Sequence, residues 1–127
     1  MSKIRHIAYR SADVETMADF FVNALGMTIT QRRKNRAIDL SDGTINITVL
    51  PMLQAGPNGE PPRQGVDHIG FTVEDDAAAL QRLESAGAKK IATIELGSPA
   101  HYEAKYKGPE GIVVDIGKWV GTEPVKH

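Results

Sequence analysis

The sequence predicts an α+β fold made of two similar halves, each ordered as one strand, one helix and three further strands. Three observations lead to this prediction: a short string that occurs twice, a helical stripe of apolar residues after each occurrence, and a glycine that ends each stripe. The string is RHIAYR at residues 5–10 and DHIGFT at residues 67–72, and its histidines, His6 and His68, are 62 residues apart. An interval of about half the 127-residue chain indicates an internal duplication.

A helix is predicted after each string, because apolar residues recur there at intervals of three and four. The first helix begins near Val14, with Ser11 or Asp13 as its N-cap, and ends at Gly26. The second ends at Gly87. The apolar stripe comprises Val14, Met17, Phe20, Phe21, Ala24 and Leu25 in the first helix, and Ala77, Leu80, Leu83 and Ala86 in the second.

Three strands are predicted after each helix. They read MTITQRR, RAIDLSD and INITVL in the first half, and KKIATIEL, YEAKYKG and IVVDIG in the second, with turns between them. The chain is therefore expected to be a single domain with modules at residues 4–50 and 66–117. Residues 51–65, rich in proline and glycine, read as a linker or exposed loop, and residues 118–127 as a C-terminal tail.

The composition excludes several classes of function. The net charge is −1, from 15 basic and 16 acidic side chains, which gives no drive to bind nucleic acid or a membrane surface. The basic tract RRKNR at residues 32–36 is interpreted as a solvated strand or turn. The absence of cysteine excludes disulfides and thiolate catalysis. With no secretory pattern and no apolar run of about 20 residues, a cytoplasmic protein is expected.

In the order and spacing of its motifs, the chain resembles the vicinal-oxygen-chelate superfamily, which includes glyoxalase I, methylmalonyl-CoA epimerase, extradiol dioxygenases and the fosfomycin and bleomycin resistance proteins. The likeness covers residues 4–117 and is carried by HIAYRSADVETMADFFVNALGM, VDHIGFTVEDDAAALQRLESAGA and AKYKGPEGIVVDIGKW. It implies two βαβββ modules whose curled mixed sheets surround a cleft, and it implies a homodimer.

The same resemblance implies a metal site. Its ligand positions fall on His6, His68 and Asp115, and the fourth position falls on Thr48. Two features depart from the family pattern: threonine is a poor metal ligand, and aspartate is one methylene shorter than the usual glutamate. Two imidazoles and a carboxylate nevertheless suit a divalent ion such as Zn, Mn, Ni or Fe(II) and leave positions open for substrate oxygens.

Each proposed ligand also has a simpler explanation. His6 and His68 are equally explained as partly buried strand residues that hydrogen-bond a neighbour. Asp115 lies in the apolar string IVVDI, where an unpaired carboxylate is costly. A metal, a cation such as Lys105 or Lys107, or solvent must therefore compensate its charge.

Further polar residues are candidates for substrate binding. Asn46 and Thr48 share one side of their strand, so they either line the cleft or face water. By family likeness, His101, Tyr102 and Tyr106 precede the final hairpin, where substrate contacts are expected. No Ser-His-Asp arrangement, phosphate-binding glycine loop or dinucleotide fingerprint is present.

The expected function is metal-dependent lyase, isomerase or dioxygenase chemistry on a small oxygenated substrate, by a glyoxalase-like protein. The alternative is a metal-free protein that sequesters a small molecule, in the manner of bleomycin resistance proteins. Thr48, in place of a fourth-strand glutamate, counts against the glyoxalase and epimerase branch.

Overall fold

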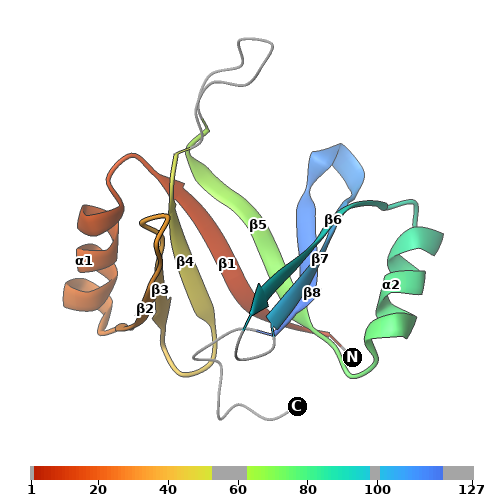
Figure 1. The fold of residues 1–127 in the computed structure, drawn as a ribbon, viewed down its shortest axis with the longest axis horizontal. Coiled ribbons are helices and arrows are strands. Elements are labelled where there is room, and N and C mark those ends of the chain that lie inside the picture. Colours follow the sequence, from red (N-terminus) through yellow and green to blue (C-terminus); the bar gives the residue numbers. More distant parts are fainter. Residues whose placement is uncertain (1, 53–62, 98–100, 119–127) are drawn as a thin grey trace. The chain divides into compact units, whose positions relative to one another are not determined.

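The computed structural model describes residues 2–52, 63–97 and 101–118, so most of the predicted linker and nearly all of the predicted tail lie outside the described residues. Its elements follow the predicted order of strand, helix and three strands, twice (Figure 1). In chain order they are β1 (Lys3–Ser11), α1 (Val14–Leu25), β2 (Thr28–Arg32), β3 (Ile38–Ser41), β4 (Asn46–Pro51), β5 (Gly65–Thr72), α2 (Asp76–Ser85), β6 (Lys89–Gly97), β7 (His101–Lys107), the 3-10 turn η1 (Pro109–Gly111) and β8 (Val113–Gly117).

The chain divides into two compact units. We call residues 7–67 the α1 unit, and residues 1–6 together with 68–118 the α2 unit. Strands follow one another as β2-β3-β4-β1 in the α1 unit and as β6-β7-β8-β5 in the α2 unit, where β5 is followed by the first residues of β1. The strand that carries the histidine thus has the same place in both units: β1 lies next to β4, and β5 lies next to β8. This agrees with the predicted duplication.

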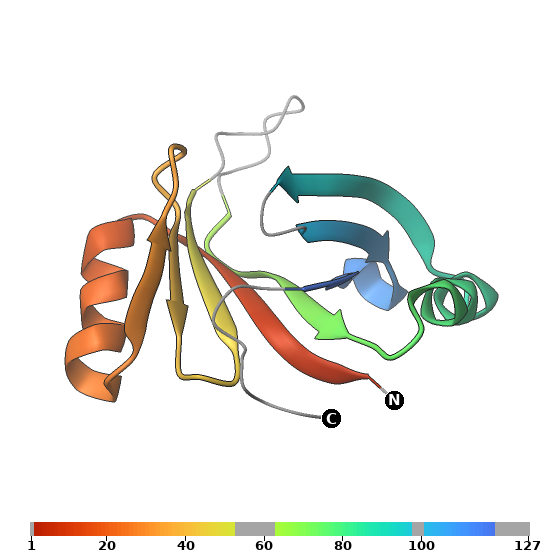
Figure 2. The same ribbon diagram turned by 60° about the horizontal axis from the view of Figure 1, so that its bottom comes forward.

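Both parallel and antiparallel strand pairs occur in this structure. In the α2 unit β5 runs parallel to β8, whereas β7 is antiparallel to both β6 and β8. Figure 2 shows β6 and β7 side by side. In the α1 unit β3 is antiparallel to both β2 and β4. The mixed α+β fold predicted from the sequence is therefore confirmed.

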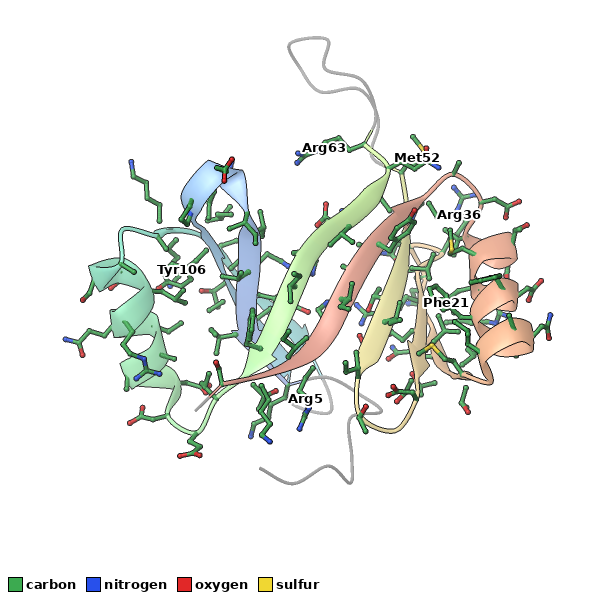
Figure 3. All side chains as sticks on the ribbon, turned by 180° about the vertical axis from the view of Figure 1, so that it is seen from behind. Arg5, Phe21, Arg36, Met52, Arg63 and Tyr106 are labelled. Carbon is green, nitrogen blue, oxygen red and sulfur yellow. The ribbon has the colours of Figure 1, made fainter. Side chains whose placement is uncertain are left out.

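The core of the α1 unit lies between α1 and its strands. Asp13 is the N-cap, since its carboxylate accepts from Thr16 N at 3.0 Å, and Gly26 ends the helix in the left-handed conformation with φ of 71°. The buried core residues are Ala18 of α1, Met27 of the connection that follows it, and Ile38, Leu40 and Val49 of the strands, packed against Val14, Met17, Phe21 and Val22 (Figure 3 labels Phe21).

The predicted apolar stripe of α1 was too wide. Phe20 and Leu25 are 56% and 62% exposed, because the contacting face follows the i, i+3, i+4, i+7 series from Val14 through Ala18 to Val22. In α2, capped by Asp75, the fully buried residue is Ala79 and not the predicted Ala77 or Ala86. Neither described helix is long and apolar enough to cross a membrane.

A partly buried ion pair links the turn that follows β2 to β3 in the α1 unit. The Asp39 carboxylate on β3 accepts from Arg33 Nε at 2.7 Å and from Arg33 Nη2 at 3.1 Å. The basic tract therefore forms the end of β2 and a turn, as predicted, but one of its arginines is held by a buried acid. Arg32, the neighbouring residue, pairs at the surface with Glu15.

We predict that Arg33→Met lowers the free energy of unfolding by about 2–4 kcal/mol, because it leaves the Asp39 carboxylate, only 1% exposed, without its cation. Arg32→Met is the matched control. Its ion pair with Glu15 is exposed, so the loss should stay below about 1 kcal/mol. Urea unfolding followed by circular dichroism measures both, and equal losses in the two variants would contradict the prediction.

Candidate metal centre

The three predicted ligands converge in the α2 unit. His6 comes from β1, His68 from β5 and Asp115 from β8, and these strands are neighbours in the sheet. One ligand atom from each side chain lies within 4.8 Å of the other two, and all three residues are buried. A divalent ion with ligand bonds of about 2.0–2.2 Å needs its ligands this close together.

The Nε2 atom of His68 is the most crowded point of the cluster. It lies 3.1 Å from His6 Nε2, 3.1 Å from Lys105 Nζ and 3.3 Å from Asp115 Oδ2. An imidazole nitrogen offers either one hydrogen or one lone pair. It cannot at the same time accept from the ammonium and donate to the carboxylate, so the hydrogen-bonding needs of this cluster conflict. Converging donor atoms whose own hydrogen bonds conflict suit coordination of a cation.

Asp115 supports the same interpretation. Its Oδ2 accepts from Lys105 Nζ at 2.9 Å, whereas its Oδ1 is buried and has no hydrogen-bond partner in the part of the chain that the structure describes. Burial, together with the negative charge of Glu103, raises the pKa of Asp115 to about 6, although Lys105 and His68 favour its ionised form. A divalent ion would satisfy the orphaned oxygen and the buried charge, so these residues fit a metal.

Lys105 balances the charge of the Asp115 carboxylate, which is one of the alternatives expected from the sequence. Lys107, the other lysine considered, is exposed. Lys105 Nζ also lies 3.1 Å from Glu103 Oε2, on the same side of β7. Burial favours the protonated form of Glu103, but the ammonium of Lys105, together with the two nearby histidines, outweighs it and lowers the pKa. Sequence reasoning missed Glu103, although its i, i+2 spacing from Lys105 in EAKYK placed both on one side of the strand.

Asn46 and Thr48 are buried in the α1 unit and so do not face water. The Thr48 hydroxyl lies 2.5 Å from Asp39 Oδ1 and 3.0 Å from Asn46 Oδ1, and its single hydrogen can serve one of them. Asp39, which the sequence did not single out, therefore belongs to this polar group. The predicted role of Asn46 and Thr48 in substrate binding remains a prediction.

Three further candidates lie on β7. The backbones of His101 and Tyr102 pair with Gly97 and Glu95 of β6, but their side chains lie outside the described part of the structure. Tyr106 alternates with Lys105, is almost fully buried, and donates its hydroxyl hydrogen to Glu84 of α2 at 3.3 Å (Figure 3). The structure therefore does not bring Tyr106 to the histidine cluster, and its predicted contact with substrate is untested.

The family assignment agrees with this geometry. The model of the Glyoxalase/Bleomycin resistance protein/Dioxygenase superfamily matches residues 3–116, so the chain belongs to this superfamily. The resemblance inferred from the repeated histidine string is thereby confirmed.

The chain is similar to two epimerases and a glyoxalase. The chain is 28% identical over 111 residues to an ethylmalonyl-CoA/methylmalonyl-CoA epimerase of Cereibacter sphaeroides, covering 80% of this chain and 83% of that protein. It is also similar in fold to methylmalonyl-CoA epimerase of Mycobacterium tuberculosis, with a TM-score of 0.68, 18% identity, and coverage of 90% of this chain and 85% of that one. A Mn(II)-bound glyoxalase of Novosphingobium aromaticivorans gives a TM-score of 0.71 at 20% identity, over 91% of this chain and 37% of that one.

We predict that the affinity of the protein for zinc falls by about tenfold between pH 7 and pH 5 through Asp115 alone. The sign follows from the raised pKa: below about 6 the carboxyl of the metal-free protein is protonated, and that proton must leave before an ion binds. Isothermal titration across this range measures the effect. Asp115→Asn should bind zinc more weakly and lose this part of the pH dependence, and an unchanged pH profile in that variant would contradict the assignment.

Proposed function

We propose that the protein is a metal-dependent isomerase that moves a proton at the carbon next to a carbonyl group, with an acyl thioester as the substrate class. The observation that carries the proposal is the convergence of His6, His68 and Asp115 around one point. The choice of isomerase over lyase or dioxygenase chemistry is supported by the similarity to an epimerase of ethylmalonyl-CoA and methylmalonyl-CoA.

His6, His68 and Asp115 would hold the ion, which supplies Lewis-acid stabilisation of the oxyanion that forms when the proton leaves. Burial of these side chains excludes water, so charges within the site interact strongly. Asp115, which stands where the family usually has glutamate, is the register partner of Lys105 across the β7–β8 pair. The side chains of these two residues form an ion pair.

Glu103 is the residue to which we assign the proton transfer. It is buried beside the cluster, and nearby cations lower its pKa, so it is ionised and able to accept a proton at neutral pH. Unlike Asp115, it does not belong to the group of three ligand atoms within 4.8 Å of one another. We therefore assign it an acid–base role and not a ligand role, with Lys105 as its ion-pair partner.

A metal-free binding protein is the second candidate, and one observation favours it. Lys105 supplies a positive charge 2.9 Å from the buried Asp115 carboxylate, so the cluster has an internal counter-ion without any metal. Metal analysis of the protein purified without chelator separates the two functions. A stoichiometric divalent ion supports the isomerase, whereas retention of a small molecule without metal supports sequestration.

We also propose that the protein forms a homodimer, as the family resemblance implies. Light scattering at micromolar concentration tests this, since a dimer has twice the 13.8 kDa mass of the chain. A single species at the monomer mass would contradict it.

The isomerase proposal predicts exchange of the proton next to the carbonyl. Metal-loaded protein in deuterated water should incorporate deuterium into methylmalonyl-CoA or ethylmalonyl-CoA, followed by mass spectrometry. Zinc, manganese, nickel and iron(II) are tested in turn. No exchange with any of them, or oxygen consumption with a catechol and iron(II) instead, would overturn the proposal.

Two variants separate metal binding from proton transfer. His68→Ala removes a ligand and should lose both metal affinity and exchange, by about a hundredfold or more. Glu103→Gln keeps the three ligands and should retain metal affinity within about tenfold while losing exchange. Isothermal titration and deuterium incorporation measure the two properties, and full exchange activity in Glu103→Gln would remove Glu103 from the mechanism.

A further inference from the structure

We infer that Lys105 controls metal binding at this site: in the metal-free protein its ammonium group occupies the lone pair of His68 Nε2, which it must leave before an ion binds, and it pairs with one oxygen of Asp115. The inference rests on the metal site of the proposed function. It adds a specificity-determining residue that is not itself a ligand and that competes with the ion from inside the protein.

The contacts of Lys105 show what it occupies. Its Nζ lies 3.1 Å from His68 Nε2 and 2.9 Å from Asp115 Oδ2, on two of the three residues proposed as ligands. A neutral imidazole nitrogen has one lone pair, so His68 Nε2 cannot accept from an ammonium and bind a metal through the same lone pair. Lys105 and the ion therefore compete directly for His68.

Electrostatics acts in the same direction. Lys105 is one positive charge next to a cluster that would receive two more, and like charges repel strongly where water is excluded. The ammonium also replaces part of what the metal would supply, because it already neutralises the buried carboxylate. Metal binding must therefore exchange one counter-ion for another.

The structure provides a position to which Lys105 can withdraw. Nζ is also 3.1 Å from Glu103 Oε2, so the ammonium can keep this partner after releasing His68. The Lys105 side chain is 14% exposed, whereas that of Asp115 is fully buried, so the solvent side of the cluster lies at the lysine. A flexible four-carbon side chain can make this movement without a change in the backbone.

The decisive experiment is isothermal titration of wild type, Lys105→Met and Lys107→Met with zinc at one pH. Lys105→Met should bind zinc about tenfold more tightly or better, since a hydrogen bond to a charged group corresponds to one or two decades in affinity. Lys107→Met removes an exposed lysine from the same side of the same strand and should stay within about twofold of wild type.

A second variant and a second readout guard against a folding defect. Lys105→Gln keeps a neutral donor and should show an affinity between those of wild type and Lys105→Met. Without metal, both variants should have a lower melting temperature than wild type, because Asp115 and Glu103 lose their cation. Zinc should then raise the melting temperature more in Lys105→Met than in wild type.

The outcomes separate this inference from the proposed function. If wild type binds zinc and Lys105→Met binds it equally or more weakly, lysine competition is overturned and the isomerase proposal stands. If Lys105→Met binds more tightly but neither protein catalyses exchange, the competition is supported and the proposed reaction fails. Absence of zinc binding in wild type and both Lys105 variants overturns the inference along with the metal site.

Discussion

The buried carboxylate of Asp115 is the constraint on which the α2 unit depends. It lies within an apolar strand and is fully buried, so its charge must be balanced within the protein. Lys105 across the β7–β8 pair and His68 on the parallel strand β5 both approach the same oxygen. Asp115 on β8 therefore requires a polar or positively charged partner on each of the two neighbouring strands, β5 and β7.

Each unit has a buried aspartate whose charge must be balanced, but the aspartate lies on a different strand in each: Asp115 on β8 and Asp39 on β3. Lys105 on β7 is registered opposite Asp115 on β8, and Asp39 on β3 is registered opposite Thr48 on β4. The carboxylate thus belongs to the last strand of one unit and to the preceding strand of the other. In the α1 unit Arg33 makes two hydrogen bonds to the acid and satisfies both of its oxygens, whereas in the α2 unit one oxygen of Asp115 remains without a partner among the described residues. The first arrangement suits a structural ion pair, and the second suits a site that binds a ligand.

Sequence reasoning succeeded where periodicity and repetition carry the information. The repeated histidine string predicted equivalent strands, and the glycines marked the ends of the helices, because these features depend on local backbone geometry. It was less accurate for the packed faces: Phe20 looked like part of an apolar stripe, but only the packing against the strands decides which apolar residues of a helix are covered. Lys105 was expected as one possible counter-ion of Asp115, but its contact with His68 could not be predicted, because strand alternation gives the side of a residue and not the reach of its side chain.

The division of the chain between His6 and Ile7 has a consequence for how such a protein can arise. His6 groups with the α2 unit although it belongs to β1, the first strand of the first repeat. A chain with only one repeat would possess the equivalents of one first strand and one last strand, so it could gather all three ligands only if a second copy contributed its own first strand. Joining two repeats places both first strands in one chain, so the contact between them becomes intramolecular. The effective concentration of the second first strand is then set by the tether between the repeats and no longer by the amount of protein in the cell.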